Sequence, residues 1–160
     1  MMKKNTFLTI CFSFFLAGSL FSQETVYVAA VAAGDANGTS EANAFGSLAD
    51  GLTAIDSSGD ILKIIGAVAT PGANLTSKSF AFTIEGTDAT ATINGDGGTG
   101  RLFTINGATS ADVTFKDLTF SDNATTLSGG AVYFNNNGGA TATFNNCIFS
   151  GNSATNNNGG

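Results

Sequence analysis

The sequence predicts an all-β protein built as a parallel β-helix, a solenoid of stacked coils, with a short helix capping its N-terminal end. Three observations predict this fold. Hydrophobic residues make up 42% of the 160 residues and include 14 Phe, yet they occur in short alternating groups separated by Gly and Asn. Such groups are typical of short strands joined by tight turns. The groups also recur at regular offsets, and a segment with helical spacing precedes them.

Residues 1–22 are expected to form a removable signal peptide. Lys3 and Lys4 make the start positive, residues 6–21 are almost free of charge, and the small Ser22 follows. The apolar run is short and no stop-transfer charges follow it, which favours a secretory leader over the alternative of an N-terminal anchor helix. Secretion and a single domain over residues 23–160 are therefore expected.

The mature chain is strongly acidic. Loss of Lys3 and Lys4 with the leader leaves four basic residues against 12 acidic ones, a net charge of −8. Such a surface repels nucleic acid and anionic lipid, so we expect no nucleic-acid partner and no membrane insertion of residues 23–160. Cys147 is the only cysteine after the leader, which excludes a disulfide within the mature chain.

The N-terminal part, about residues 26–58, is expected to close one end of the solenoid, whose last coil otherwise exposes unpaired backbone. Residues 26–28 are predicted to form a strand and residues 34–43 a loop. Phe45, Leu48, Leu52 and Ile55 then recur at helical spacing. We expect this helix to lie across the end of the solenoid, with an ordinary surface helix as the alternative. The coils are expected over about residues 60–160.

Residues 113–123 and 142–152 are two copies of one repeat at an offset of 29 residues. A polar stretch and a Gly-Gly pair follow each copy. Residues 82–86 match residues 103–107 at a shorter offset of 21. The lengthening of the repeat predicts an insertion, and residues 121–130 are expected to form it as a bulging loop.

Apolar residues aligned by these offsets form columns that we expect to stack inside the solenoid. Alternation along each strand directs these residues inward and places Thr between them on the outside. Cys147 is therefore expected to point inward as a small apolar residue. The predicted columns are Phe82/Phe103/Val132, Ile84/Ile105/Phe134, Ala91/Val113/Ala142, Ile93/Phe115/Phe144, Leu118/Cys147 and Phe120/Phe149.

Two alternating motifs resemble the repeats of polymorphic outer membrane proteins. Their FxxN element is matched by Phe120 with Asn123 and by Phe149 with Asn152. Their GGA-aliphatic element is matched by Gly129 and Gly130 before Ala131-Val132, and Gly159 and Gly160 would begin the next one. Residues 27–66 are similar to the first coil of secreted right-handed β-helix proteins of the pectin-lyase-like class.

This resemblance implies a right-handed β-helix on a bacterial cell surface or outer membrane, often with an adhesive or structural role. Proteins of this kind often carry a C-terminal translocator or sorting domain. Because Gly160 falls where a further strand would begin, we expect the chain to be the N-terminal fragment of a longer repeat protein.

Pectin-lyase-like folds also include polysaccharide lyases and glycosidases, which need grouped carboxylates with calcium or a basic residue. Here Arg101 lies near Asp96, but Asp112, Asp117 and Asp122 are spread along one coil. We therefore expect no catalytic residue and no cofactor in this segment. Residues 95–98, Gly-Asp-Gly-Gly, are the one candidate calcium loop, and a tight turn explains them as well.

The expected function is that of a non-catalytic cell-surface passenger, adhesin-like or structural. Its polar loops, residues 121–130 and 153–158, are expected to meet glycans or surface proteins. The alternative is the N-terminal part of a carbohydrate-active β-helix enzyme whose catalytic coils lie beyond residue 160.

Overall fold

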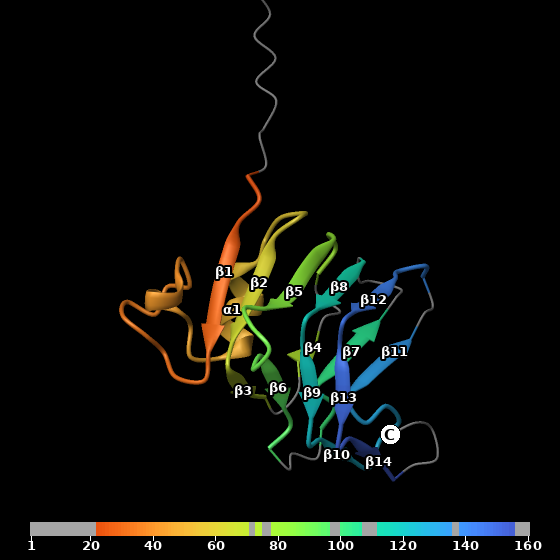
Figure 1. The fold of residues 1–160 in the computed structure, drawn as a ribbon. Helices are drawn as coiled ribbons and strands as arrows, with labels where there is room; N and C mark the ends of the chain where they lie inside the picture. The colour runs from red at the N-terminus through yellow and green to blue at the C-terminus, as the bar shows by residue number, and fades with distance from the viewer. Residues whose placement is uncertain are drawn as a thin grey trace, which may run out of the picture.

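The computed structural model describes residues 22–70, 73–74, 78–96, 100–106, 112–135 and 138–155. The predicted signal peptide, except Ser22, and the pair Gly159–Gly160 lie outside the described residues. Short β-strands dominate, with one α-helix and one 3-10 helix (Figure 1). The elements in chain order are β1 (Thr25–Ala29), η1 (Glu41–Asn43), α1 (Leu48–Ala54), β2 (Ile61–Ile65), β3 (Ala67–Ala69), β4 (Ala73–Asn74), β5 (Phe82–Gly86), β6 (Thr92–Asn94), β7 (Phe103–Asn106), β8 (Val113–Lys116), β9 (Thr119–Ser121), β10 (Ala124–Thr125), β11 (Val132–Asn135), β12 (Ala142–Asn145), β13 (Ile148–Ser150) and β14 (Ser153–Ala154).

The strands form three larger parallel sheets and one small pair. The first sheet has the order β1-β2-β5-β8-β12, the second β3-β6-β9-β13 and the third β4-β7-β11, while β10 pairs with β14. Figure 1 shows the first sheet side by side, from β1 in orange to β12 in blue. After each strand of the first sheet the chain adds one to the second. We call each such run a passage: β2–β4, β5–β7, β8–β11 and β12–β14.

The core lies between the sheets, where alternate side chains meet. In β5, Phe82 and Ile84 are buried while Thr83 between them is partly exposed, and β8 repeats this pattern with Val113 and Phe115. Each fully buried apolar side chain of this size contributes about 1.5–3 kcal/mol relative to an exposed one. The largest side chains with less than 2% exposure are Phe103, Phe115, Phe120, Leu48, Ile55, Leu62, Ile64, Ile84, Ile93, Leu102 and Ile105.

Helix α1 covers the core at the β1 end. Its N-cap is Ser47, whose Oγ accepts a hydrogen bond of 3.1 Å from the backbone N–H of Asp50. Leu48 and Leu52 on one face of the helix are buried in the common hydrophobic cluster. At Gly51 the helix approaches so closely that a Cβ atom would lie 2.2 Å from Cγ2 of Val28. The predicted helix is therefore present and packs on the first strand.

A buried carboxylate joins this helix to the first passage. Asp60 is 0% exposed, and its Oδ1 accepts a 2.9 Å hydrogen bond from the N–H of Glu24. Its Oδ2 accepts hydrogen bonds from the N–H groups of Asp56 at 3.1 Å and Ser57 at 2.9 Å. Hydrogen bonds to an ionised acceptor are the stronger kind. Asp60 thus fixes both the chain before β1 and the turn after α1.

The register of the last two passages follows the 29-residue offset. Strands β8 and β12 pair directly, as do β9 with β13 and β7 with β11. The opposed residues from the predicted columns are Val113 with Ala142, Phe115 with Phe144, Phe120 with Phe149, Phe103 with Val132 and Ile105 with Phe134.

The columns built on the shorter offsets are wrong. Phe82 pairs with Val113 and not with Phe103, because β5 belongs to the first sheet and β7 to the third. Likewise Ile84 pairs with Phe115 and not with Ile105. Residues 82–86 and 103–107 look alike because both strands have the same inside–outside alternation, not because they stack.

The second sheet requires the same correction. Ile93 pairs with Phe120 and not with Phe115. Ala91 immediately precedes β6, so it belongs with this sheet and not with Val113 of the first. The 22-residue shift therefore relates two sheets of the stack, whereas the 29-residue shift relates two strands of one sheet.

Residues 121–130 do not form a bulging loop. Ser121 ends β9, and β10 within this segment pairs with β14. Asn123 and Thr125 are buried, whereas Leu127 is 46% exposed. The inserted residues thus fold into an extra two-stranded edge beside the second and third sheets. The second predicted loop also begins in a strand, β14, and residues 156–158 lie outside the described part.

Candidate functional site

Asn123 connects the two halves of the repeat motif. Phe120 of the FxxN element is fully buried, and Asn123 three residues later is 1% exposed. The Asn123 side-chain amide donates a hydrogen bond to the carbonyl of Gly130 in the Gly-Gly-Ala element. A buried amide needs such a partner, because leaving it unpaired costs about 1–3 kcal/mol. The motif residues therefore form one internal contact.

Asn152, the equivalent residue of the last passage, links that passage to the one before. Its Nδ2 donates a 2.8 Å hydrogen bond to the carbonyl of Phe120, and its Oδ1 accepts a 3.3 Å bond from the N–H of Asn123. Gly159 and Gly160 lie outside the described residues. The FxxN asparagines thus bond within and between passages and do not present a free polar group to solvent.

Arg101 holds the arm that leads from β10 to β11. Its Nε donates a 2.5 Å hydrogen bond to the carbonyl of Ser128, and its guanidinium lies 4.1 Å from the ring centroid of Tyr133. Such a cation–π contact stabilises by about 0.5–1 kcal/mol at an exposed site. Nothing in the spacing of Arg101 and Tyr133 along the sequence indicates this contact.

The three aspartates considered as catalytic candidates each bond to a neighbouring passage. Oδ1 of Asp112 accepts a 2.7 Å hydrogen bond from the N–H of Thr141, and Oδ1 of Asp117 accepts one of 2.7 Å from the side chain of Asn146. Oδ2 of Asp122 accepts a 3.3 Å bond from Asn94. The structure does not bring the three carboxylates to one point, so they serve as ties between passages.

The candidate calcium loop is only partly described. Asp96 has a positive φ of 48°, and its N–H donates to Oδ1 of Asn94 at 2.5 Å, which makes a tight turn. Gly97 and Gly98 lie outside the described residues. Among the residues that are described, no group of three or more His, Cys, Asp or Glu side chains is arranged to hold a metal ion.

Cys147 is partly buried against the hydrophobic cluster, as its predicted inward orientation requires. It occupies the turn before β13, whose Ile148 N–H donates to the carbonyl of Leu118 at 2.9 Å. Burial raises the pKa of the Cys147 thiol. The thiol is therefore less ionised at neutral pH than a free cysteine, which disfavours nucleophilic chemistry.

A chain of charges crosses the outer face of the first sheet. Lys63 and Lys116 both contact Oε1 of Glu85, at 3.0 and 3.1 Å, and Lys116 also lies 3.6 Å from Asp117. Burial opposes ionisation of Glu85, but the hydrogen bonds from Lys63 and Lys116 outweigh it and lower the pKa of this carboxyl. The carboxylate of Glu85 also raises the pKa of Lys116.

This charge chain borders a polar groove of about 370 Å³ at the corner between the first and second sheets. We call it the corner groove and define it by Lys63, Glu85, Asp88, Asp117, Thr119, Asn146 and Ile148. Asp88, Asn146 and Ile148 are exposed. The side-chain hydrogen bond from Asn146 lowers the pKa of Asp117, so the groove keeps its carboxylates ionised above strongly acidic pH.

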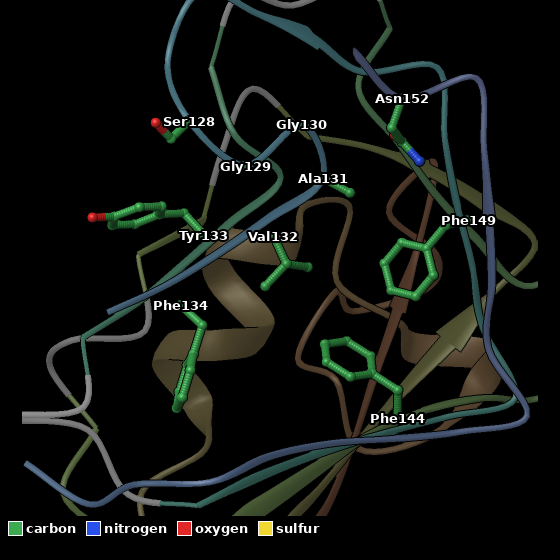
Figure 2. Close-up of a pocket in the computed structure, with 10 residues that line it drawn as sticks. All are labelled: Ser128, Gly129, Gly130, Ala131, Val132, Tyr133, Phe134, Phe144, Phe149 and Asn152. Carbon is green, nitrogen blue, oxygen red and sulfur yellow. The ribbon is translucent and has the colours of Figure 1, made fainter. Parts of the chain in front are cut away.

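A second and larger hollow of about 540 Å³ lies at the β11–β13 end of the stack. We call it the end groove and define it by Ala131, Val132, Phe134, Phe144, Phe149 and Asn152. Figure 2 shows Phe134, Phe144 and Phe149 directed into one space from three strands, with Tyr133 pointing away from it. The grouping of these side chains follows from the register and could be predicted from the 29-residue columns.

No family model matches the chain, and neither a curated protein nor a solved structure matches it. No helix in the described part of the chain is long and apolar enough to cross a membrane.

Proposed function

We propose that this chain is a secreted, non-catalytic cell-surface protein, an adhesin-like or structural passenger, whose body is a right-handed parallel β-helix. The β-helix is supported by three parallel sheets to which successive passages add one strand each, in register. The right-handed sense follows the general preference of parallel crossover connections. Secretion is supported by the apolar leader sequence.

One observation carries the non-catalytic role: outward charged side chains pair with one another from passage to passage. Lys63, Glu85 and Lys116 lie on three successive strands of the first sheet and neutralise one another. Asp112 and Asp117 bond to residues of the following passage in the same way. Side chains committed to such contacts stabilise a stack and do not converge on a substrate.

The corner groove is the surface that we propose meets a partner, with neutral glycans as the first class to test. It combines hydroxyl, amide and carboxylate groups with the exposed side chain of Ile148. Carboxylate and amide oxygens accept hydrogen bonds from sugar hydroxyls, and the amide of Asn146 can also donate. The acidic surface around the groove disfavours acidic polysaccharides.

A glycan array probed with the secreted chain tests this function. Binding to neutral glycans that falls at least fivefold in the double variant Asp117→Ala/Asn146→Ala is the expected result. The matched control is Thr104→Ala on the third sheet, which should bind as the parent chain does. Release of reducing or unsaturated ends from a polysaccharide panel would instead assign catalysis to the chain and contradict the proposal.

A further inference from the structure

The apolar side chains that remain exposed are concentrated at one end of the stack. Of the six large hydrophobic residues exposed among those described, four lie in β11–β13: Phe134, Phe144, Ile148 and Phe149. Their partners in the preceding passage include Ile105, Phe115 and Phe120, which are all 0% exposed. The difference between buried and exposed therefore arises from position in the stack and not from residue type.

The strands at this end have a described neighbour on one side only. Strands β11, β12 and β13 are the last members of the third, first and second sheets. Each presents backbone groups and side chains in the arrangement that the preceding strand presents to it. The end groove runs between these strands, and Phe134, Phe144 and Phe149 line it together (Figure 2).

We propose that the end groove binds a further polypeptide passage of the same repeat, in parallel orientation, with aromatic side chains stacked on Phe144 and Phe149. The contacts already present define this occupant. Phe144 stacks on Phe115 with ring centroids 5.0 Å apart and planes at 7°, and Phe149 stacks on Phe120 at 4.9 Å and 12°. These spacings match the separation of about 4.7–4.9 Å between adjacent strands.

Polar contacts specify the occupant further. Asn152 donates to the carbonyl of Phe120, and Asn146 donates to Asp117 of the passage before. A passage added in the same register places an Asn beside the carbonyl of Phe149. The occupant is thus recognised by an FxxN element in parallel register and not by apolar character alone.

A second copy of the chain fits the groove less well. The opposite end of the stack is closed by α1, which packs on Val28 through Gly51, so head-to-tail stacking has no open surface to use. Two copies that meet through their end grooves are related by a two-fold axis, which makes their strands antiparallel and loses the parallel register. The like net charges of two copies also oppose this contact.

The test is an extended chain in which residues 131–155 are repeated once after Gly160. Gly159 and Gly160 then precede the copy as Gly129 and Gly130 precede the original. Backbone amide exchange is followed by mass spectrometry in peptides covering residues 142–150, together with fluorescence of an apolar dye. The expected result is exchange at least tenfold slower than in the parent chain, with weaker dye binding.

The matched control is the same extension carrying Phe144→Asp and Phe149→Asp in the appended copy only, which should exchange as the parent does. Unchanged exchange in the first extension, or equal protection by both, overturns the proposal. Sedimentation of the parent chain gives the remaining outcome. A dimer in which residues 142–150 are already protected would make a second copy the occupant and would also overturn it. Glycan binding at the corner groove does not enter this test, so the two proposals fail independently.

Discussion

Phe144 stacks on Phe115 with ring centroids 5.0 Å apart, yet Phe115 is completely buried and Phe144 is 38% exposed. The two residues are 29 positions apart and occupy the same place in successive strands of the first sheet. Their contact marks the boundary between the interior of the stack and its open end. The same boundary separates Phe120 from Phe149 in the second sheet.

Truncation of a buried ring should therefore cost much more than truncation of its exposed partner. Phe120→Ala removes a fully buried ring and should lower the free energy of unfolding by about 3–5 kcal/mol. Phe149→Ala removes a ring that is 50% exposed and should cost less than about half of that. Urea titration followed by circular dichroism measures both. Equal losses would show that the two rings have the same surroundings in solution.

Asn123 should stabilise the fold through its buried amide. Asn123→Ala leaves the Gly130 carbonyl without this donor and should cost about 1–3 kcal/mol. The matched control is Asn146→Ala, which removes an exposed amide and should cost below about 1 kcal/mol. Limited proteolysis at residues 126–130 should accelerate only in the Asn123 variant. Faster cleavage in neither variant would argue against the link between the two motif halves.

Glu85 should make stability depend on pH in the acidic range. The pKa of its carboxyl is lower in the folded chain than its ordinary value of 4.5. The ion pairs with Lys63 and Lys116 therefore stabilise fully above that value, and their contribution disappears as pH falls through the lower folded pKa. At pH 7 the parent should exceed Glu85→Gln in stability by about 0.5–1 kcal/mol, and at pH 3 the difference should shrink.

Thermal unfolding at a series of pH values measures this difference for Glu85→Gln. The control is Glu41→Gln, on the exposed surface of η1, which should follow the parent at every pH. A gap between parent and Glu85→Gln that is the same at pH 3 and pH 7 would rule out a contribution from ionised Glu85.

Gly51 should be intolerant of the smallest side chain although it lies within a helix. Ala is ordinarily favoured over Gly in a helix by about 1 kcal/mol. Here a Cβ at position 51 meets Val28 and Leu62, so Gly51→Ala should destabilise the chain despite that preference. Ala49→Gly on the exposed face of α1 should cost about 1 kcal/mol by propensity alone. A higher melting temperature for Gly51→Ala would show that α1 does not pack closely on β1.

The sequence was sufficient to predict the strand-rich class, the capping helix and the pairing of the last two passages. Phe115 and Phe144 could be matched because two long copies of the repeat preserve residue type at a fixed offset. Phe82 and Phe103 were placed in one column because strands of different sheets share the same alternation, and alternation does not say which sheet a strand joins.

The corner groove could not be predicted because it depends on which charges become neighbours across strands. Lys63 and Glu85 are 22 residues apart and Glu85 and Lys116 are 31 apart, so no constant offset identifies their contact. Asp60 was equally hidden, because its burial depends on backbone N–H groups that no side-chain pattern reports. The end groove was easier to anticipate, since its aromatic residues belong to the most regular part of the repeat.

Closure of the stack by α1 at one end only gives partial unfolding a direction. Each passage contacts mainly the passages before and after it, and only the β1 end is sealed by buried residues such as Leu48. Fraying therefore starts at β12–β14 and advances one passage at a time toward the sealed end. The partly unfolded forms of this protein are shortened versions of the native stack, and each of them exposes a fresh aromatic row at its edge.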